Sequence, residues 1–288
     1  MHVELVRTVT RDGLRLDGAF SDPVKPGLNR SGATAAILLH GVASNFYSLG
    51  MWEPLIGKFS DLGIRSLAVN TRGHDSVFGA SLGNVRRRLG AAYEIVDDCR
   101  LDIAAWIEFL QSRGHERIAL VGHSLGAVKA VYAAAQEKFS ALAAVIAISP
   151  PRLSYTAYMN APESSFFWDS MHTAQQMSKA GQGEELFTSK FPFPLLITAA
   201  AYIDKYGPGE RYNLLQYAAD VPCPALFVYG GKELTNGGVP FAGLPDALAA
   251  LPNADRRTIE IIEEADHFYT GVAGKLAEVV TPWVQGIR

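Results

Sequence analysis

A serine, a glutamate and a histidine stand in this chain at positions that favour acyl-transfer chemistry. Ser124 lies at the centre of the pentapeptide G-H-S-L-G, residues 122–126, between a short apolar run at 118–121 and a helix-forming stretch at 127–135. This context is typical of a serine that sits on a sharp turn between a strand and a helix, with its hydroxyl exposed. Backbone N–H groups at the start of that helix would then point at the group that the serine attacks.

Two further side chains are predicted to activate this serine. A serine hydroxyl is a weak nucleophile at neutral pH unless a base accepts its proton. His267 suits that role because it follows the last predicted strand and because an imidazole titrates near neutrality. Glu233 follows the preceding predicted strand, and an anion beside His267 would fix its tautomer and stabilise the imidazolium. We therefore predict a triad of Ser124, Glu233 and His267.

Other residues of the same types compete for two of these roles. Ser81 lies in a second G-x-S-x-G match, residues 79–83, but no buried strand precedes it, so we interpret it as a loop residue. Asp246, or a carboxylate after the predicted strand at 143–148 such as Glu163, could supply the acid instead of Glu233. These alternatives stay open on the sequence alone.

The other six histidines are assigned to less direct roles. His2 and His115 are expected at the surface, and His172 on a solvated face. His40 and His74 follow predicted strand ends, where hydrogen bonding inside the protein is the expected role. His40 is also a candidate substrate contact, and the remaining histidine, His123, is the variable residue of the pentapeptide.

Composition limits the class of protein. The chain has 288 residues, of which 48% are hydrophobic, enough for one large α/β domain with an insertion or for two domains. Its net charge of −3 gives no electrostatic case for nucleic acid or for an anionic membrane. The first residues contain no apolar signal segment, and the densest apolar runs, 141–148 and 195–203, are much shorter than the roughly 20 residues that span a bilayer.

The cysteines and the absence of ligand-binding motifs in the sequence further limit the class of protein. The two cysteines, Cys99 and Cys223, form no C-x-x-C motif and are expected to be reduced core thiols. The sequence contains no metal-ligand cluster and no phosphate-cradling loop, so no cofactor and no metal is expected. We predict a soluble cytoplasmic protein that binds a small molecule, with no nucleic-acid or membrane partner; its oligomeric state is left open.

Strands alternate with helices along most of the chain, which predicts a mostly parallel central sheet with helices on both faces. Residues 3–10 and 14–20 are expected to form an antiparallel pair. Further strands are expected at residues 35–39, 65–69, 118–121, 143–148, 225–229 and 257–262. Helices are expected at 52–62, 93–113, 127–135, 244–251 and 272–285, and the arginine run 86–88 is expected on a solvated helix face.

Residues 152–221 interrupt this alternation. They show no clear strand and are rich in aromatic residues, and a structureless loop of that length is uncommon in a compact domain. We therefore predict a helical cap insertion between two parts of one core, residues 1–151 and 222–288. A cap at this point of the chain would lie over the carboxyl ends of the strands, where open α/β sheets bind ligands. Its residues Phe166, Phe167 and Trp168 are expected to contact the substrate.

These motifs together resemble the α/β-hydrolase superfamily over essentially the whole chain. The triad order Ser, acid, His is that of the superfamily, although Glu233 stands where its members usually have aspartate. His40-Gly41 is similar to the oxyanion-loop signature, and the resemblance implies that the backbone N–H groups of Val42 and Leu125 bind the oxyanion. The run 40–47 also resembles a branch that includes fungal siderophore esterases.

The resemblance implies a serine esterase that cleaves a carboxylic ester through an acyl-enzyme intermediate. Thioester, amide or peroxyacid chemistry on the same triad is the alternative within enzymes. Because a fold does not fix a function, a ligand-binding protein on a hydrolase scaffold remains the alternative of another class.

Overall fold

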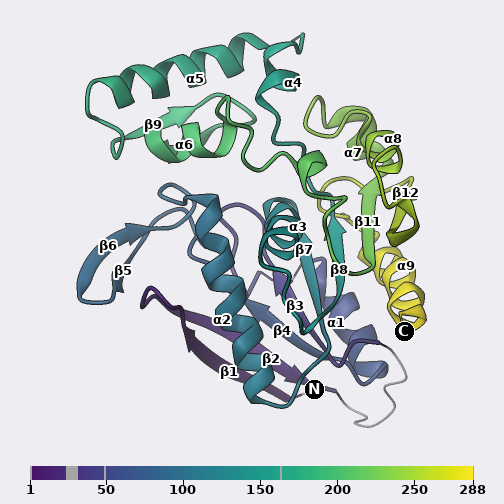
Figure 1. Cartoon of the computed structure of the whole chain (residues 1–288). Helices are drawn as coiled ribbons and strands as arrows, with labels where there is room; N and C mark the ends of the chain where they lie inside the picture. The colour runs from purple at the N-terminus through teal and green to yellow at the C-terminus, as the bar shows by residue number, and fades with distance from the viewer. Residues whose placement is uncertain (1, 24–31, 49, 163, 288) are drawn as a thin grey trace.

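An eight-stranded sheet forms the centre of the protein. The computed structural model describes residues 2–23, 32–48, 50–162 and 164–287 (Figure 1). The strands follow the spatial order β1-β2-β4-β3-β7-β8-β11-β12, and those from β4 to β12 run parallel, whereas β1 and β2 are antiparallel to their neighbours. Their bounds are β1 His2–Val9, β2 Arg15–Asp22, β3 Ala35–Leu39, β4 Arg65–Val69, β7 Ile118–His123, β8 Leu142–Ile148, β11 Ala225–Gly230 and β12 Arg257–Ile262. The predicted fold class is confirmed.

Helices cover both faces of this sheet because its central strands are apolar on both sides. In β3, Ile37 faces one buried cluster and Leu38 the other, as expected for side chains that alternate along a strand. Helices α2 (Cys99–Ser112) and α3 (Leu125–Glu137) pack in the first cluster. Helices α1 (Trp52–Asp61) and α9 (Ala273–Gly286) pack in the second.

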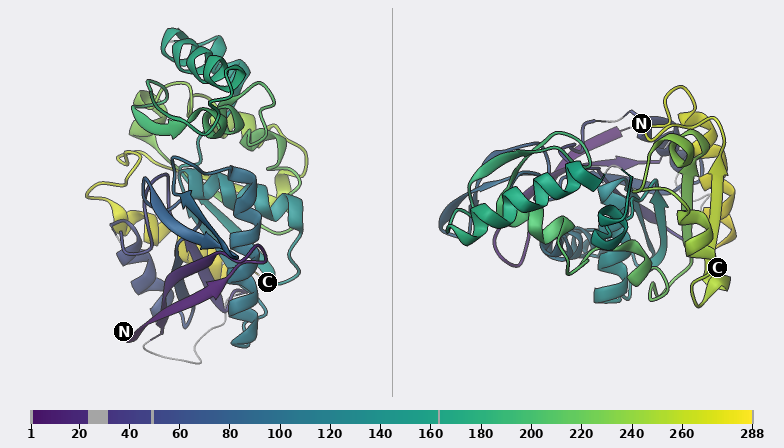
Figure 2. Two further views of the ribbon diagram at one scale, coloured as in Figure 1. Left: turned by 90° about the vertical axis from the view of Figure 1, so that its left-hand side faces the viewer. Right: turned by 90° about the horizontal axis from the view of Figure 1, so that it is seen from above.

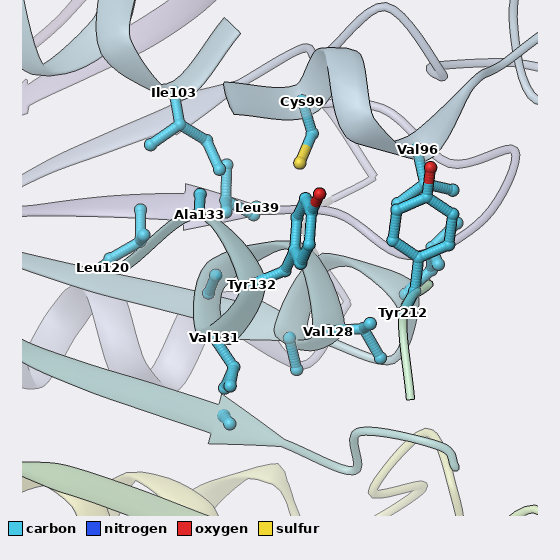
Figure 3. Packing of buried hydrophobic residues seen from close by; sticks show 14 of the residues in the cluster. Leu39, Val96, Cys99, Ile103, Leu120, Val128, Val131, Tyr132, Ala133 and Tyr212 are labelled. Atoms are coloured by element: carbon cyan, nitrogen blue, oxygen red, sulfur yellow. The ribbon is translucent and has the colours of Figure 1, made fainter. Parts of the chain in front are cut away.

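The first cluster encloses one of the two cysteines. Figure 3 shows Cys99 of α2 pointing into a group of apolar side chains to which α3 contributes Val128, Val131 and Tyr132. Burial raises the pKa of this thiol, and it raises that of Cys223 to about 12. Both cysteines are buried and free, as the sequence predicted.

The segment 152–221 lies over the carboxyl ends of the parallel strands and forms the upper part of the molecule in Figure 1 and in the left view of Figure 2. We call this segment the cap. It contains α4 (Tyr155–Met159), α5 (Ser164–Lys179), β9 (Leu186–Ser189), β10 (Leu195–Thr198), α6 (Ala199–Tyr206) and the short 3₁₀ helix η2 (Leu214–Gln216). The antiparallel pair β9–β10 departs from the expectation of a wholly helical insertion, because periodicity does not distinguish short apolar strands from helix.

A second hairpin corrects two expectations. Ser81 lies in strand β5 (Phe78–Leu82), and the arginine run 86–88 lies in strand β6 (Val85–Leu89). The expected loop position of Ser81 and the expected helix at the arginine run were therefore both wrong. Gly83-Asn84 is a two-residue connection between them, and Gly83 has a φ of +58° that favours glycine. This Gly-Asn pair is the turn signal that the sequence interpretation overlooked.

The remaining elements are short. They are the 3₁₀ helices η1 (Val96–Asp98) and η3 (Ala254–Arg256) and the helices α7 (Gly231–Asn236) and α8 (Leu244–Ala249). The helix expected from residue 93 therefore begins at Cys99, after a 3₁₀ turn. Within the described residues, no helix is both long and apolar enough to cross a membrane.

Candidate active site

Ser124 occupies a strained turn between β7 and α3. Its φ of 55° and ψ of −124° are rare for a residue with a side chain. The turn is possible because Gly122 and Gly126 flank it: a Cβ on Gly122 would lie 2.2 Å from the Gly126 carbonyl oxygen, and one on Gly126 2.4 Å from the Leu39 oxygen. The Ser124 N–H donates to the carbonyl of Ile148 on the neighbouring strand at 2.9 Å. These contacts hold the serine at the end of the sheet.

The structure brings the three residues of the predicted triad together. The Ser124 Oγ lies 3.0 Å from Nε2 of His267, and Nδ1 of His267 is hydrogen-bonded to Oε1 of Glu233. Parallel strands explain this meeting, because Glu233 follows β11 and His267 follows its partner β12 at the same edge of the sheet. Gly230 allows the two loops to approach, since a Cβ there would lie 2.4 Å from the Ala265 carbonyl oxygen.

The carboxylate of Glu233 is buried and held by more than His267. Its Oε2 accepts a hydrogen bond from the Ser149 hydroxyl at 2.6 Å and lies 3.4 Å from the Gly230 N–H. The hydroxyl of Tyr269 lies 3.2 Å from the Ser149 hydroxyl. Such partners compensate a buried carboxylate for the water it has lost. The sequence interpretation missed Ser149, although its position directly after β8, between the nucleophile and acid strands, was a usable signal.

The alternative acids are placed differently. Asp246 is exposed on α8, and the carboxylate in contact with His267 is that of Glu233. Glu163 lies outside the described residues. Ser81, the alternative serine, lies in the β5–β6 hairpin. Among the described residues, the geometry therefore favours Glu233 over Asp246 and Ser124 over Ser81 as the partners of His267.

The two residues expected to supply the oxyanion N–H groups both border the cavity that contains Ser124. Val42 and Leu125 both contribute to the wall of the cavity around Ser124, and within the described chain no hydrogen bond from either N–H is found. Leu125 is the first residue of α3, where N–H groups lack partners inside the helix. The loop after β3 reaches this point because Gly41 has no side chain: a Cβ there would lie 3.2 Å from that of Ser124.

Buried neutral histidines flank the triad. His123 lies 4.8 Å from His267 between ring centroids, and its Nε2 donates to the His267 carbonyl at 2.7 Å. Burial and the neighbouring His267 lower the pKa of His123 to about 3. His40 donates from Nδ1 to the Gly41 carbonyl at 2.7 Å, and burial together with the charge of Lys129 lowers its pKa to about 4.

The other histidines lie away from the triad. His74 is hydrogen-bonded to Asp75 and stacks on Phe78, with 3.9 Å between ring centroids. His2 and His172 are exposed, as expected. His115 is buried against Phe20, so its expected surface position was wrong. The helix that precedes His115 ends at Ser112, and the turn that follows brings the ring back against the sheet.

A cavity of about 720 Å³ opens above Ser124, between the core and the cap. Its wall is mainly apolar and aromatic. The core contributes His40, Gly41, Val42, Ser44, Ser48, Gly50, Met51, Trp52, His123, Leu125, Pro151, Gly237, Pro240, Phe241, His267 and Phe268, and the cap contributes Leu153, Tyr158, Pro192, Phe193 and Tyr206. Within the described residues, no three His, Cys, Asp or Glu side chains are grouped so as to hold a metal ion.

The structure does not place the expected aromatic contacts at this cavity. Phe167 is fully buried inside the cap, against Tyr158 and Phe191. Phe166 and Trp168 are 52% and 48% exposed, and neither contributes to the cavity wall. The helix face that carries Phe167 packs on the rest of the cap, so its neighbours in sequence point outward.

The chain is similar in sequence to known proteins. The sequence model described as the alpha/beta hydrolase family matches residues 36–279. An uncharacterized 31.7 kDa protein of Escherichia coli, from the traX-finO intergenic region, is 28% identical over 247 residues, which cover 78% of this chain and 82% of that protein.

Solved structures of similar fold cover nearly the whole chain. The esterase domain of a Rhodothermus marinus protein superimposes with a TM-score of 0.61 at 17% identity, over 99% of this chain and 98% of that domain. Est1E from Butyrivibrio proteoclasticus, solved with ferulic acid bound, gives a TM-score of 0.65 at 16% identity, over 98% and 99% of the two chains. The alpha/beta hydrolase GrgF from Penicillium sp. sh18 gives 0.66 at 15%, over 100% and 99%.

The buried histidines predict a stability that falls in acid. Unfolded histidine titrates near pH 6.5, whereas folded His40 and His123 stay neutral until about pH 4 and pH 3. Between these values the unfolded chain binds more protons, so the free energy of unfolding decreases as pH falls. We expect each histidine to lower it by about 1.4 kcal/mol between pH 7.5 and pH 5.5, measured by urea denaturation.

Replacing one of them tests this assignment. In His123→Gln, the decrease over the same interval should be smaller by about 1.4 kcal/mol. The exposed His172 is the matched control, and His172→Gln should leave the decrease unchanged. An identical pH dependence in wild type and His123→Gln would contradict the neutral, buried state of His123.

Proposed function

Because the chain belongs to the alpha/beta hydrolase family, we propose that it is a serine esterase that cleaves a carboxylic ester of a small molecule. The continuous hydrogen bonding from the Ser124 hydroxyl through His267 to buried Glu233, at the floor of a cavity, carries this proposal. A serine on a strained turn with an imidazole nitrogen at 3.0 Å from its hydroxyl oxygen is arranged for attack on a carbonyl carbon. A ligand-binding protein on this scaffold would not require these three side chains in contact.

The proposed reaction has two stages. The Ser124 oxygen bonds to the carbonyl carbon of the ester as His267 takes its proton, and the carbonyl oxygen becomes an oxyanion facing the N–H groups of Val42 and Leu125. Collapse of this intermediate breaks the bond to the alcohol, which leaves with the proton from His267. Water then attacks the acyl-enzyme by the same route and releases the acid.

The cavity suggests which esters fit. Its apolar and aromatic wall, with Trp52, Phe241 and Phe193 around the serine, favours an acyl or aryl group that is itself apolar. Est1E, a relative in fold, was solved with ferulic acid, an aromatic acid, bound. We therefore place aromatic and medium-length acyl esters first among the substrates to test, beside the matching thioesters and amides.

Covalent labelling tests the nucleophile. A fluorophosphonate probe should react with one serine per chain, Ser124, because its hydroxyl is hydrogen-bonded to His267. Ser124→Ala should abolish both labelling and ester hydrolysis. Ser81→Ala, in the second G-x-S-x-G match, is the control and should leave both unchanged. Labelling or turnover that survives in Ser124→Ala would overturn the proposed function.

The acid can be tested by a change that keeps its shape. In Glu233→Gln, the neutral amide can select the wrong tautomer of His267, so kcat should fall by a factor on the order of 10² to 10⁴. Asp246→Asn, at an exposed position of α8, should retain nearly full activity. Steady-state kinetics with p-nitrophenyl esters measures both; the reverse pattern would assign the acid to Asp246.

Two cap aromatics of similar exposure form a matched pair for the pocket. Phe193 is 43% exposed and contributes to the cavity wall, whereas Phe166 is 52% exposed and does not. Phe193→Ala should change the ratio of kcat/KM between long and short esters by a factor that corresponds to about 1–3 kcal/mol, the free energy of one pocket contact. Phe166→Ala should leave this ratio unchanged, and an equal shift in both variants would remove Phe193 from the pocket.

A further inference from the structure

A network of buried polar side chains, here called the buried polar network, extends from the cap to the loop beside Ser124. Its members are Lys205 of α6, Glu94 before η1, Lys129 of α3, Thr71 after β4 and His40 after β3. None is more than 3% exposed. The triad chemistry uses none of these side chains directly, so their burial needs another explanation.

Ion pairs and hydrogen bonds connect each member of the buried polar network to the next. Lys205 Nζ lies 3.7 Å from Glu94 Oε2, and Glu94 Oε1 lies 2.5 Å from Lys129 Nζ. Lys129 Nζ donates to the Thr71 hydroxyl at 3.1 Å, and the Thr71 backbone N–H donates to His40 Nε2 at 3.2 Å. The other ring nitrogen of His40 donates to the Gly41 carbonyl at 2.7 Å.

Stability alone does not account for two lysines and a glutamate at this depth. Removing such ions from water costs several kcal/mol each, and apolar side chains of the same volume often stabilise a core as well or better. Burial lowers the pKa of Lys205, against the pull of Glu94. Gly73 makes room for the arrangement, since a Cβ there would lie 2.0 Å from a Glu94 carboxylate oxygen.

At the end of the buried polar network, His40 contacts the peptide group between Gly41 and Val42, which takes part in the proposed reaction. The Gly41 carbonyl and the Val42 N–H belong to one planar peptide group, in which the two bonds point in opposite directions. Fixing the carbonyl against His40 therefore fixes the direction of the Val42 N–H, and Val42 contributes to the cavity wall. Lys129 donates to the Thr71 hydroxyl oxygen and leaves its hydrogen free for Nε2 of His40, at 3.3 Å. Together with the Thr71 backbone N–H at 3.2 Å, that hydrogen orients the ring of His40 in the tautomer that donates to Gly41.

We propose that Lys129 is a positioning residue for the oxyanion site, acting through Thr71 and His40 on the Val42 N–H, and that Glu94, itself paired with Lys205 of the cap, holds the Lys129 side chain in place. This inference rests on the proposed function, because it assigns the Val42 N–H to an oxyanion. Lys129 touches no reacting atom. Its loss should therefore weaken the stabilisation of the transition state and leave binding of the ester in the cavity largely intact.

The test compares Lys129→Met with wild type on matched pairs of esters and thionoesters. A thionoester develops its negative charge on sulfur, which backbone N–H groups bind poorly, so its hydrolysis depends less on the oxyanion site. We expect kcat for the ester to fall about ten- to hundredfold with KM within about twofold, as for a misplaced oxyanion donor. The rate ratio of ester to thionoester should fall by a similar factor.

Two further variants complete the design. Thr71→Val keeps the shape and the backbone N–H but removes the hydroxyl, so it should lower the same ratio by a smaller factor. Lys190→Met removes an exposed cap lysine that pairs with Asp169, and should leave kcat and the ratio unchanged. If Lys129→Met does not fold, as judged by circular dichroism, Thr71→Val decides the question.

The outcomes separate the inference from the proposed function. If wild type hydrolyses no ester and takes up no probe at Ser124, the proposed function fails and this inference fails with it. If wild type is active but folded Lys129→Met and Thr71→Val keep its ester-to-thionoester ratio, the inference alone is wrong. An equal loss of ester and thionoester hydrolysis would assign the buried polar network to folding, and this result would also overturn the inference.

Discussion

The turn at Ser124 is the constraint on which the rest of the site depends. To enter α3 directly from β7, the chain takes a strained backbone conformation, and Gly126 then packs against the carbonyl oxygens at the end of β3. The same approach brings the loop after β3, with Gly41, against the Cβ of Ser124. One steric requirement therefore exposes the hydroxyl, directs the first N–H of α3 and places the Val42 peptide beside it. Larger side chains at these glycines would separate all three.

Parallel strand order supplies the rest of the arrangement. β7, β8, β11 and β12 are neighbours in the sheet, so Ser124, Ser149, Glu233 and His267 emerge in a row at one edge. Each buried polar group there has a partner in the next position: the serine faces the imidazole, the imidazole the carboxylate, and the carboxylate the Ser149 hydroxyl. Satisfied networks of this kind are rigid because each broken contact leaves a buried polar group without a partner.

Sequence reasoning succeeded where the decisive signal was local. Strand ends followed by glycine and one reactive side chain are readable, which explains why the sheet and the contacts among Ser124, Glu233 and His267 could be anticipated. The substrate wall could not be, because whether Phe193 or Phe166 meets the cavity depends on how the cap docks, and aromatic density carries no direction. The buried pair of Glu94 and Lys129 joins segments that are far apart in the chain, so spacing gives no sign of it. The β5–β6 hairpin differs, since its Gly-Asn turn was visible and was overlooked.

The central claim is that Ser124 carries the acyl group during turnover. Rapid mixing of the protein with a p-nitrophenyl ester, followed by acid quench and mass spectrometry of its peptides, measures this directly. The account predicts a burst of about one equivalent of p-nitrophenol wherever deacylation is the slower step, and the acyl mass on the peptide that contains Ser124. Turnover in which this peptide stays unmodified while another residue carries the acyl group would contradict it.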